Sequence, residues 1–163
     1  MTDDGHVIIE HLPLPAQVNL RVDPSLAERV SYPLPLEPNT AWESGSRAAL
    51  WLGPDEWLLI GPPDAGPWIV EEVGAALRGT HHSVVDVSAS RVALELRGLG
   101  VRELLSKGCS IDLHPRVWTA GSCAQTVLGK APVILHERDE ATRILVRTSF
   151  TDHLTEWFQA SGA

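Results

Sequence analysis

The chain has 163 residues, of which 44% are hydrophobic, and carries a formal net charge of -8 at pH 7. Such a chain fits one compact soluble domain, or two small modules that pack closely together. The negative charge and the lack of a basic run argue against nucleic acid or an anionic membrane as the main partner, and no apolar run is long enough to span a bilayer.

The beginning of the chain and its cysteines bear on localisation. Residues 1–6 (MTDDGH) lack the positive and apolar regions of a signal peptide. There are only two cysteines, Cys109 and Cys123, and the sequence leaves open whether they pair. We expect a cytoplasmic protein with reduced thiols.

The first 40 residues predict an N-terminal arm that ends in a proline-rich connection. Strands are expected at residues 7–12 and 17–22, and a short helical stretch at 24–30. The segment 31–40 (SYPLPLEPNT) has three prolines, which favour an extended surface path over a helix. We therefore place a boundary at residue 40 and expect one α+β domain in residues 41–163.

Residues 50–64 (LWLGPDEWLLIGPPD) predict a β-hairpin, because Gly, Pro and Asp supply a turn between two apolar runs. Two acids, Asp55 and Glu56, lie at its tip and could form a catalytic pair. Neighbouring residues on a strand point to opposite faces, however, so the two cannot readily act on one substrate. We interpret them as the solvated turn of a scaffold.

The remaining elements alternate between strands and helices. Strands are expected at 83–87, 92–96, 123–128, 133–136 and 144–147, and helices at 67–78, 100–107 and 150–159. The run at 83–87 predicts a buried strand, whereas the alternation at 92–96 predicts a half-buried one. Ser149, with Asp152 three residues later, resembles a capping box at the start of the last helix.

The order strand, turn, strand, helix occurs twice, in residues 48–77 and 132–158. Two similar α+β units would produce this repeat. We predict an α+β fold in which helices cover the faces of antiparallel-rich sheets, for example as two ferredoxin-like units.

Cysteine and histidine side chains are candidates for a metal site or a nucleophile. Cys109, His114 and Cys123 could ligate a metal together with His81 or His82, but the chain has no C-x2-C or H-x3-H pair. Cys109 as a nucleophile would need a neighbouring base, and buried cysteine is more often inert. We predict neither kind of site.

A polar bend is a candidate for ligand binding. Asp86, Ser88 and Ser90 lie close to Arg91 in the sequence and could surround a ligand. Short polar side chains between two strands more often satisfy their own backbone, and we favour that interpretation.

A glycine pair resembles part of a dinucleotide-binding loop. Gly98 and Gly100 follow an expected strand and open an expected helix, but Glu103 stands where the third glycine of the motif belongs. We interpret the two glycines as turn and helix-start residues.

Six tryptophans are unusual beside one tyrosine and two phenylalanines. They are Trp42, Trp51, Trp57, Trp68, Trp118 and Trp157. Tryptophan is enriched at the energetic centres of interfaces but is also ordinary core material, and we assign most of the six to the core.

The last expected helix carries an apolar stripe of Phe150, Leu154, Trp157 and Phe158. Either the chain's own sheet or a partner subunit must cover this stripe. The internal repeat favours the sheet, in which case Trp157→Ala should destabilise the chain by roughly 3–5 kcal/mol.

Seven blocks of the sequence follow one another in a distinctive order. They are VNLRVDP (18–24), LPLEPNTAW (34–42), LWLGPDEWLLIGPP (50–63), DVSASRVALELRG (86–98), LLSKGCSIDLHP (104–115), GSCAQTVLGKAPVIL (121–135) and ILVRTSFTDHLTEWF (144–158). These blocks resemble the gamma subunit of heterotetrameric sarcosine oxidase, over nearly all of the chain from about residue 17.

The resemblance implies a subunit of a complex that oxidatively demethylates sarcosine to glycine. The complex produces hydrogen peroxide, and formaldehyde or methylene-tetrahydrofolate. FAD and covalent FMN are expected in the beta subunit, NAD and tetrahydrofolate in the alpha subunit, and zinc in the delta subunit, with no cofactor in the gamma subunit.

A more distant similarity runs to the folate-binding domain of the glycine-cleavage T-protein, an aminomethyltransferase. It covers residues 86–113 and implies a T-protein-like half as the second form of the fold. The T-protein then has a hairpin whose glycine-rich turn leads into acidic residues, one of them catalytic. The comparable segment here, Lys130–Leu135 (KAPVIL), has no carboxylate.

These observations predict a non-catalytic accessory subunit, with no catalytic, cofactor-binding or metal-binding residue in the chain. The expected partners are the alpha, beta and delta subunits. The alternatives are a stand-alone folate-binding or aminomethyltransferase-like protein, and an interaction module for an unrelated enzyme.

Overall fold

The computed structural model describes residues 6–162, so the expectation about the first five residues lies outside its range. The chain divides into two compact units. Unit 1 takes the N-terminal residues up to Leu12 and everything from Ser90 onward, and unit 2 is the continuous segment Pro13–Ala89. The boundary expected at residue 40 falls inside unit 2, because the two N-terminal strands pair with strands much later in the chain.

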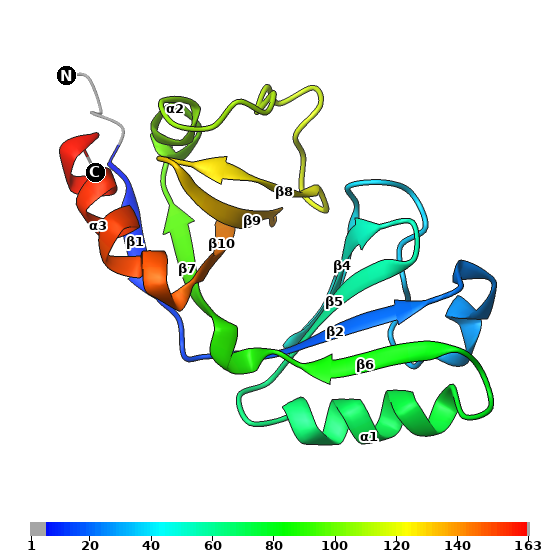
Figure 1. Ribbon diagram of the computed structural model, residues 1–163. Coiled ribbons are helices and arrows are strands. Elements are labelled where there is room, and N and C mark those ends of the chain that lie inside the picture. The colour runs from blue at the N-terminus through cyan, green and yellow to red at the C-terminus, as the bar shows by residue number, and fades with distance from the viewer. Residues whose placement is uncertain (1–5, 163) are drawn as a thin grey trace. The chain divides into compact units, whose positions relative to one another are not determined.

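Unit 2 is an antiparallel five-stranded sheet with one α-helix against it (Figure 1). Its elements are β2 (Ala16–Val22), η1 (Pro24–Arg29), β3 (Ala41–Ser44), β4 (Arg47–Gly53), β5 (Glu56–Gly61), α1 (Gly66–Ala76) and β6 (His82–Asp86), with the 3-10 turn η2 (Ser88–Ser90) at the unit boundary. The strand order is β3-β4-β5-β2-β6.

The core of unit 2 lies between this sheet and α1. Val18 and Leu20 alternate onto the helix-facing side of β2, and Leu59 and Trp57 are their partners on β5. The helix contributes Ile69, Val73 and Leu77, whose spacing of four residues places them on one face. The hairpin expected at residues 50–64 is the β4–β5 pair, with a bulge at Leu52.

Unit 1 is also an antiparallel five-stranded sheet, and it has two α-helices. Its elements are β1 (Ile8–His11), β7 (Arg91–Arg97), α2 (Val101–Ser106), β8 (Cys123–Leu128), β9 (Ala131–Glu137), β10 (Thr142–Arg147), η3 (Thr148–Phe150) and α3 (Thr151–Ala160). The antiparallel strand order is β1-β7-β10-β9-β8. Leu154 and Phe158 of α3 and Leu104 and Leu105 of α2 lie in its core.

The two sheets correspond strand for strand. β3, β4, β5, β2 and β6 of unit 2 occupy the positions of β8, β9, β10, β7 and β1 of unit 1. In unit 2 the edge strand β6 follows α1, whereas in unit 1 the edge strand that pairs with β7 is β1, from the other end of the chain. The predicted α+β fold and the internal repeat are therefore confirmed.

Three local predictions were wrong. β6 is an edge strand with Val85 half exposed, because a short apolar run cannot distinguish an edge strand from a central one. β7 is buried on both faces, because Glu95, on the face expected to be exposed, is buried with its carboxylate in an ion pair. The last helix has Phe150 at its N-cap without a side-chain cap, because η3 occupies the place of the expected capping box.

Two further points follow from the described residues. Cys109 and Cys123 are both buried free thiols, which settles the open question of pairing. Within residues 6–162, no helix has both the length and the apolar character needed to cross a membrane.

Candidate functional site

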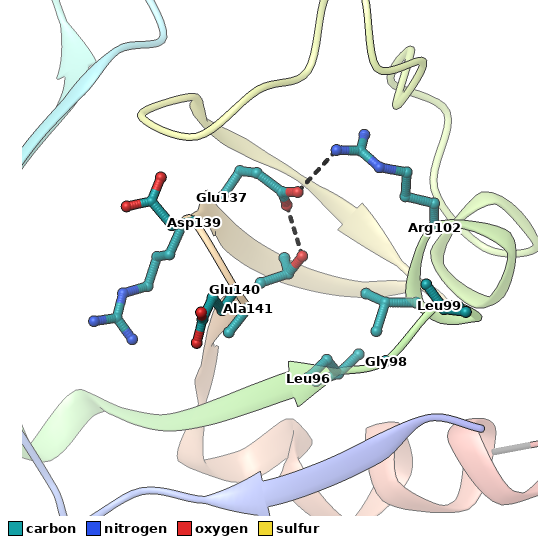
Figure 2. Close-up of a pocket in the computed structure, with 11 residues that line it drawn as sticks. Leu96, Gly98, Leu99, Arg102, Glu137, Asp139, Glu140 and Ala141 are labelled. Atoms are coloured by element: carbon teal, nitrogen blue, oxygen red, sulfur yellow. Dashed lines mark hydrogen bonds and ion pairs between the residues drawn. The ribbon is translucent and has the colours of Figure 1, made fainter. Parts of the chain in front are cut away.

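A pocket of about 390 Å³ lies in unit 1 between the β7–α2 turn and the β9–β10 turn (Figure 2). The residues that line it are Leu96, Gly98, Leu99, Val101, Arg102, Glu137, Arg138, Asp139, Glu140, Ala141 and Thr142. In Figure 2 Leu99 and Arg102 lie on one side, and Asp139 and Glu140 on the other. The pocket combines an aliphatic floor with several charged groups.

Glu137, the last residue of β9, lines this pocket. Its Oε1 accepts a hydrogen bond from Arg102 Nη2 at 3.0 Å, and its Oε2 accepts from Trp118 Nε1 at 3.0 Å and Thr142 Oγ1 at 2.6 Å. Arg102 also donates to the carbonyl of Leu113 at 2.5 Å. The carboxylate thus ties together α2, the α2–β8 loop and β10.

This arrangement suits a structural carboxylate better than an acid–base catalyst. A general base must accept a proton from a substrate within hydrogen-bond reach. Both oxygens of Glu137 are already occupied by three donors from the chain itself. Removing those partners would leave a mostly buried charge uncompensated, which is strongly destabilising.

A second buried carboxylate, Glu95, lies in the middle of β7. Only 3% of the residue is exposed, and it pairs with Arg97 on its own strand and with Arg138 Nη1 at 2.5 Å. No motif or spacing in the sequence singles out Glu95, Glu137 or Arg102. In the sequence, Glu95 and Arg97 are only the polar side of an alternating strand. Nothing in the sequence reveals that Glu95 forms an ion pair with Arg138, 43 positions away.

The acids at the hairpin tip are fixed by a neighbouring strand. Arg21 Nη2 contacts both oxygens of Asp55, at 3.0 and 2.9 Å, and Asn19 donates to Glu56 Oε1 at 2.9 Å. The hydrogen bond that Arg21 donates to Asp55, together with the negative charges of Asp55 and Glu56, raises the pKa of Arg21 above its ordinary value. These contacts attach the β4–β5 turn to β2, as a scaffold would require.

The polar bend makes the local hydrogen bonds of a self-satisfied turn. Asp86 Oδ1 accepts from the backbone N–H of Ser88 at 2.9 Å and from its hydroxyl at 2.5 Å. The hydroxyl of Ser88 in turn accepts from the backbone N–H of Gln17 at 2.9 Å. Another oxygen of Asp86 closely approaches Gly66 at the start of α1, where a Cβ would lie only 2.2 Å from it.

The candidate metal ligands do not come together. Among residues 6–162 the structure contains no group of three or more Cys, His, Asp or Glu side chains placed to hold a metal ion. Cys109 lies 3.6 Å from the hydroxyl of Thr126, while His114 Nδ1 accepts from the backbone of Arg116. His82 Nδ1 contacts the carbonyl of Thr80 in unit 2.

The glycine pair has a packing role. Gly98 has φ +115°, and a Cβ there would lie 2.0 Å from the carbonyl oxygen of His6. Gly100 is the N-cap of α2. The two glycines are therefore turn and helix-start residues, as predicted.

Most tryptophans belong to the core, as predicted. Trp57 and Trp118 are buried, and Trp42, Trp51 and Trp157 are partly buried against the two core clusters. Trp68 is the exception, with 56% of the residue exposed.

The apolar stripe of α3 packs against its own unit, which confirms the first of the two alternatives. Leu154 and Phe158 are buried, whereas Trp157 is only partly covered. The indole of Trp157 fits over two glycines: a Cβ on Gly108 would lie 2.4 Å from the ring, and one on Gly129 2.6 Å.

Comparisons with known proteins show the family to which the chain belongs. Residues 20–163 match the family model described as sarcosine oxidase, gamma subunit family. The chain is also 35% identical over 161 residues to the sarcosine oxidase subunit gamma of Arthrobacter sp., and the match covers 94% of this chain and 78% of that protein. The chain belongs to the sarcosine oxidase gamma subunit family.

Solved structures extend the similarity to the fold of this gamma subunit family member. It is similar to a chain of the heterotetrameric sarcosine oxidase from Corynebacterium sp. U-96 in complex with pyrrole 2-carboxylate, with a TM-score of 0.87, 32% identity, and coverage of 95% of this chain and 83% of that one. The glycine cleavage system aminomethyltransferase T from Bartonella henselae matches with a TM-score of 0.71 at 12% identity, covering 94% of this chain and 45% of that one. The T-protein-like form of the predicted fold is therefore confirmed.

The hairpin compared with the T-protein is the β8–β9 pair of this gamma subunit family member. Its turn is formed by Gly129 and Lys130, both with positive φ. β9 then runs from Ala131 to Glu137, so the first carboxylate after the turn is Glu137, at the strand's far end. That carboxylate is the one held by Arg102, Trp118 and Thr142.

Proposed function

We propose that this chain is a non-catalytic accessory subunit of a cytoplasmic, flavin-dependent sarcosine oxidase complex. The observation that carries the proposal is the family match over residues 20–163. The complex would oxidise sarcosine to glycine, and the reaction would take place in the partner chains.

The arrangement of the chain's own polar groups supports a role without chemistry. The pocket carboxylate Glu137 is occupied by three internal donors, and the hairpin acids Asp55 and Glu56 are bound by Asn19 and Arg21. The proposal includes that no residue of this chain binds a cofactor or metal. FAD, FMN, NAD, zinc and tetrahydrofolate would belong to alpha, beta and delta subunits.

The proposal is tested by purifying the chain alone and after co-expression with the other subunits. We expect the isolated chain to be colourless, free of metal after dialysis and unable to oxidise sarcosine, and we expect it to co-purify with the active complex. A flavin absorption spectrum, or stoichiometric zinc, in the isolated chain would contradict the proposal.

Titration with tetrahydrofolate distinguishes the stand-alone alternative. An accessory subunit should not bind the folate by itself, because the T-protein likeness extends to the fold alone. Saturable binding in the micromolar range by the isolated chain would favour a folate-binding protein instead.

A further inference from the structure

The most exposed aromatic side chain of unit 2 lies at the start of α1. Trp68 is 56% exposed, although the other three tryptophans of this unit pack against its core. Leaving an indole in water forgoes the burial of one of the largest apolar side chains. Tryptophan is also one of the residue types enriched among those that carry the binding energy of interfaces.

Prolines hold the chain around Trp68 in one conformation. Pro62, Pro63 and Pro67 are all exposed, and Pro67 occupies the first turn of α1. The N–H of Ala65 donates to the carbonyl of Pro62 at 3.2 Å, which closes the turn before the helix. We call the exposed side chains of Pro62, Pro63, Pro67 and Trp68 the Trp68 patch. Because proline fixes φ, little conformational entropy is lost when such a patch binds.

Two carboxylates flank the Trp68 patch. Asp64 is exposed immediately before the helix, and Glu71 is exposed three residues after Trp68, which places it on the same helix face. Among residues 6–162, neither carboxylate forms an ion pair. Both negative charges therefore remain uncompensated beside the indole.

We propose that the Trp68 patch docks onto a segment of a partner subunit that presents an arginine or lysine beside an apolar surface. A guanidinium can stack on the indole face and pair with Glu71 or Asp64 at the same time. The exposed prolines close to Trp68 in the sequence offer further apolar area for such a contact to bury. This inference rests on the proposed function, because it assigns the contact to another subunit of the oxidase complex.

The test measures affinity between the purified chain and a complex of the remaining subunits. Trp68→Ala should raise the dissociation constant by roughly 30-fold or more, the size expected for an interface hot spot. Glu71→Lys should weaken it by roughly tenfold, since it places a cation against the partner's cation. The matched control is Leu36→Ala, in the same unit and 60% exposed, which should change the constant by less than about threefold.

Unfolding of the free variants separates docking from folding. Because Trp68 and Glu71 are exposed, neither substitution should shift the urea midpoint of the free chain appreciably. A lowered midpoint for Trp68→Ala, with Glu71→Lys binding normally, would overturn the inference by making Trp68 a folding residue.

The outcomes distinguish this inference from the proposed function. If the unmodified chain joins the other subunits and both variants join equally well, the docking surface lies elsewhere and only the inference fails. If the unmodified chain does not join them, the proposed function fails as well. If the free chain is a dimer that Trp68→Ala dissociates, the occupant is a second copy of the chain and the inference is overturned.

Discussion

The two units build the same sheet from differently ordered chain segments. Unit 2 is continuous, and its edge strand β6 follows directly after α1. In unit 1 the corresponding position beside β7 is filled by β1, which is separated from β7 by all of unit 2. The same position at the edge of the sheet can therefore be filled by a strand from a different part of the chain. The order of the strands along the chain does not by itself decide their order in the sheet.

Helix α1 of unit 2 and helix α3 of unit 1 also differ in the side chain that packs against glycine. In unit 2, Ile69 of α1 approaches Gly61 at the end of β5, where a Cβ would lie 2.7 Å from its Cδ1. In unit 1, Trp157 of α3 covers Gly108 and Gly129. One unit thus accommodates a branched aliphatic side chain and the other an indole, and both use glycine to let the helix approach.

Large losses of stability are expected from the buried leucines that α1 and α3 bring to the two cores. Leu154 in unit 1 and Leu77 in unit 2 are both 0% exposed. Leu154→Ala and Leu77→Ala should each lower the free energy of unfolding by about 3 kcal/mol, because each deletes the same buried atoms and leaves a cavity. Urea unfolding followed by circular dichroism measures both. A loss below about 1 kcal/mol in only one variant would break the correspondence between the units.

Substitution of two glycines by alanine, one in each unit, should change the free energy of unfolding in opposite directions. Gly108→Ala in unit 1 should cost about 1–3 kcal/mol, because the new Cβ would overlap the Trp157 ring. Gly74→Ala in unit 2 should stabilise by about 0.5–1 kcal/mol, since Gly74 lies inside α1 with open space beside it. Trp157→Leu should recover part of the loss in the Gly108→Ala chain, and additive effects would show that ring and glycine are not coupled.

Tyr32 of unit 2 should produce a smaller, pH-dependent effect. Its hydroxyl donates to the carbonyl of Ile60 at 3.2 Å, and burial raises the pKa of the phenol above its ordinary value. A raised folded-state pKa gives stability that is complete below about pH 10, the ordinary phenol value, and is lost as the pH rises through the folded pKa. Chemical unfolding from pH 8 to 11 should therefore show a steeper alkaline loss for the unmodified chain than for Tyr32→Phe. Parallel curves would contradict this.

The smallest effect is expected at the hairpin tip. Asp55→Ala and Glu56→Ala should leave turnover of the assembled complex within about twofold of normal, because removing a true acid–base group costs about 100-fold or more. Steady-state rates of reconstituted complexes provide the measurement. A hundredfold loss with assembly intact would assign chemistry to these acids.

Some elements of unit 2 could be predicted because they depend on residues that are close together in the sequence. The β4–β5 hairpin has its turn residues beside its apolar runs, and the spacing of Ile69, Val73 and Leu77 predicts the inner face of α1. The strand β3 was missed, since its four residues follow a proline-rich segment and lack a clear alternation. Its partner β4 supplies the hydrogen bonds that make it a strand.

The candidate site was beyond sequence reasoning for a related reason. Glu137, Arg102 and Trp118 come from separate elements, and each looks like an ordinary surface or core residue by itself. Glu95 also looks ordinary in the sequence, because its ion-pair partner Arg138 lies in the distant β9–β10 turn. An ion pair across the sheet leaves no periodic pattern in the chain.

The sequence by itself determined the fold class, the helix and strand pattern and the family resemblance, because short-range periodicity and turn residues act within a few positions. Only the tertiary structure decided that β1 completes the sheet of unit 1, that both cysteines stay unpaired and that Trp68 is exposed among six tryptophans. These features depend on which distant surfaces meet, and burial and long-range pairing are properties of the packed chain.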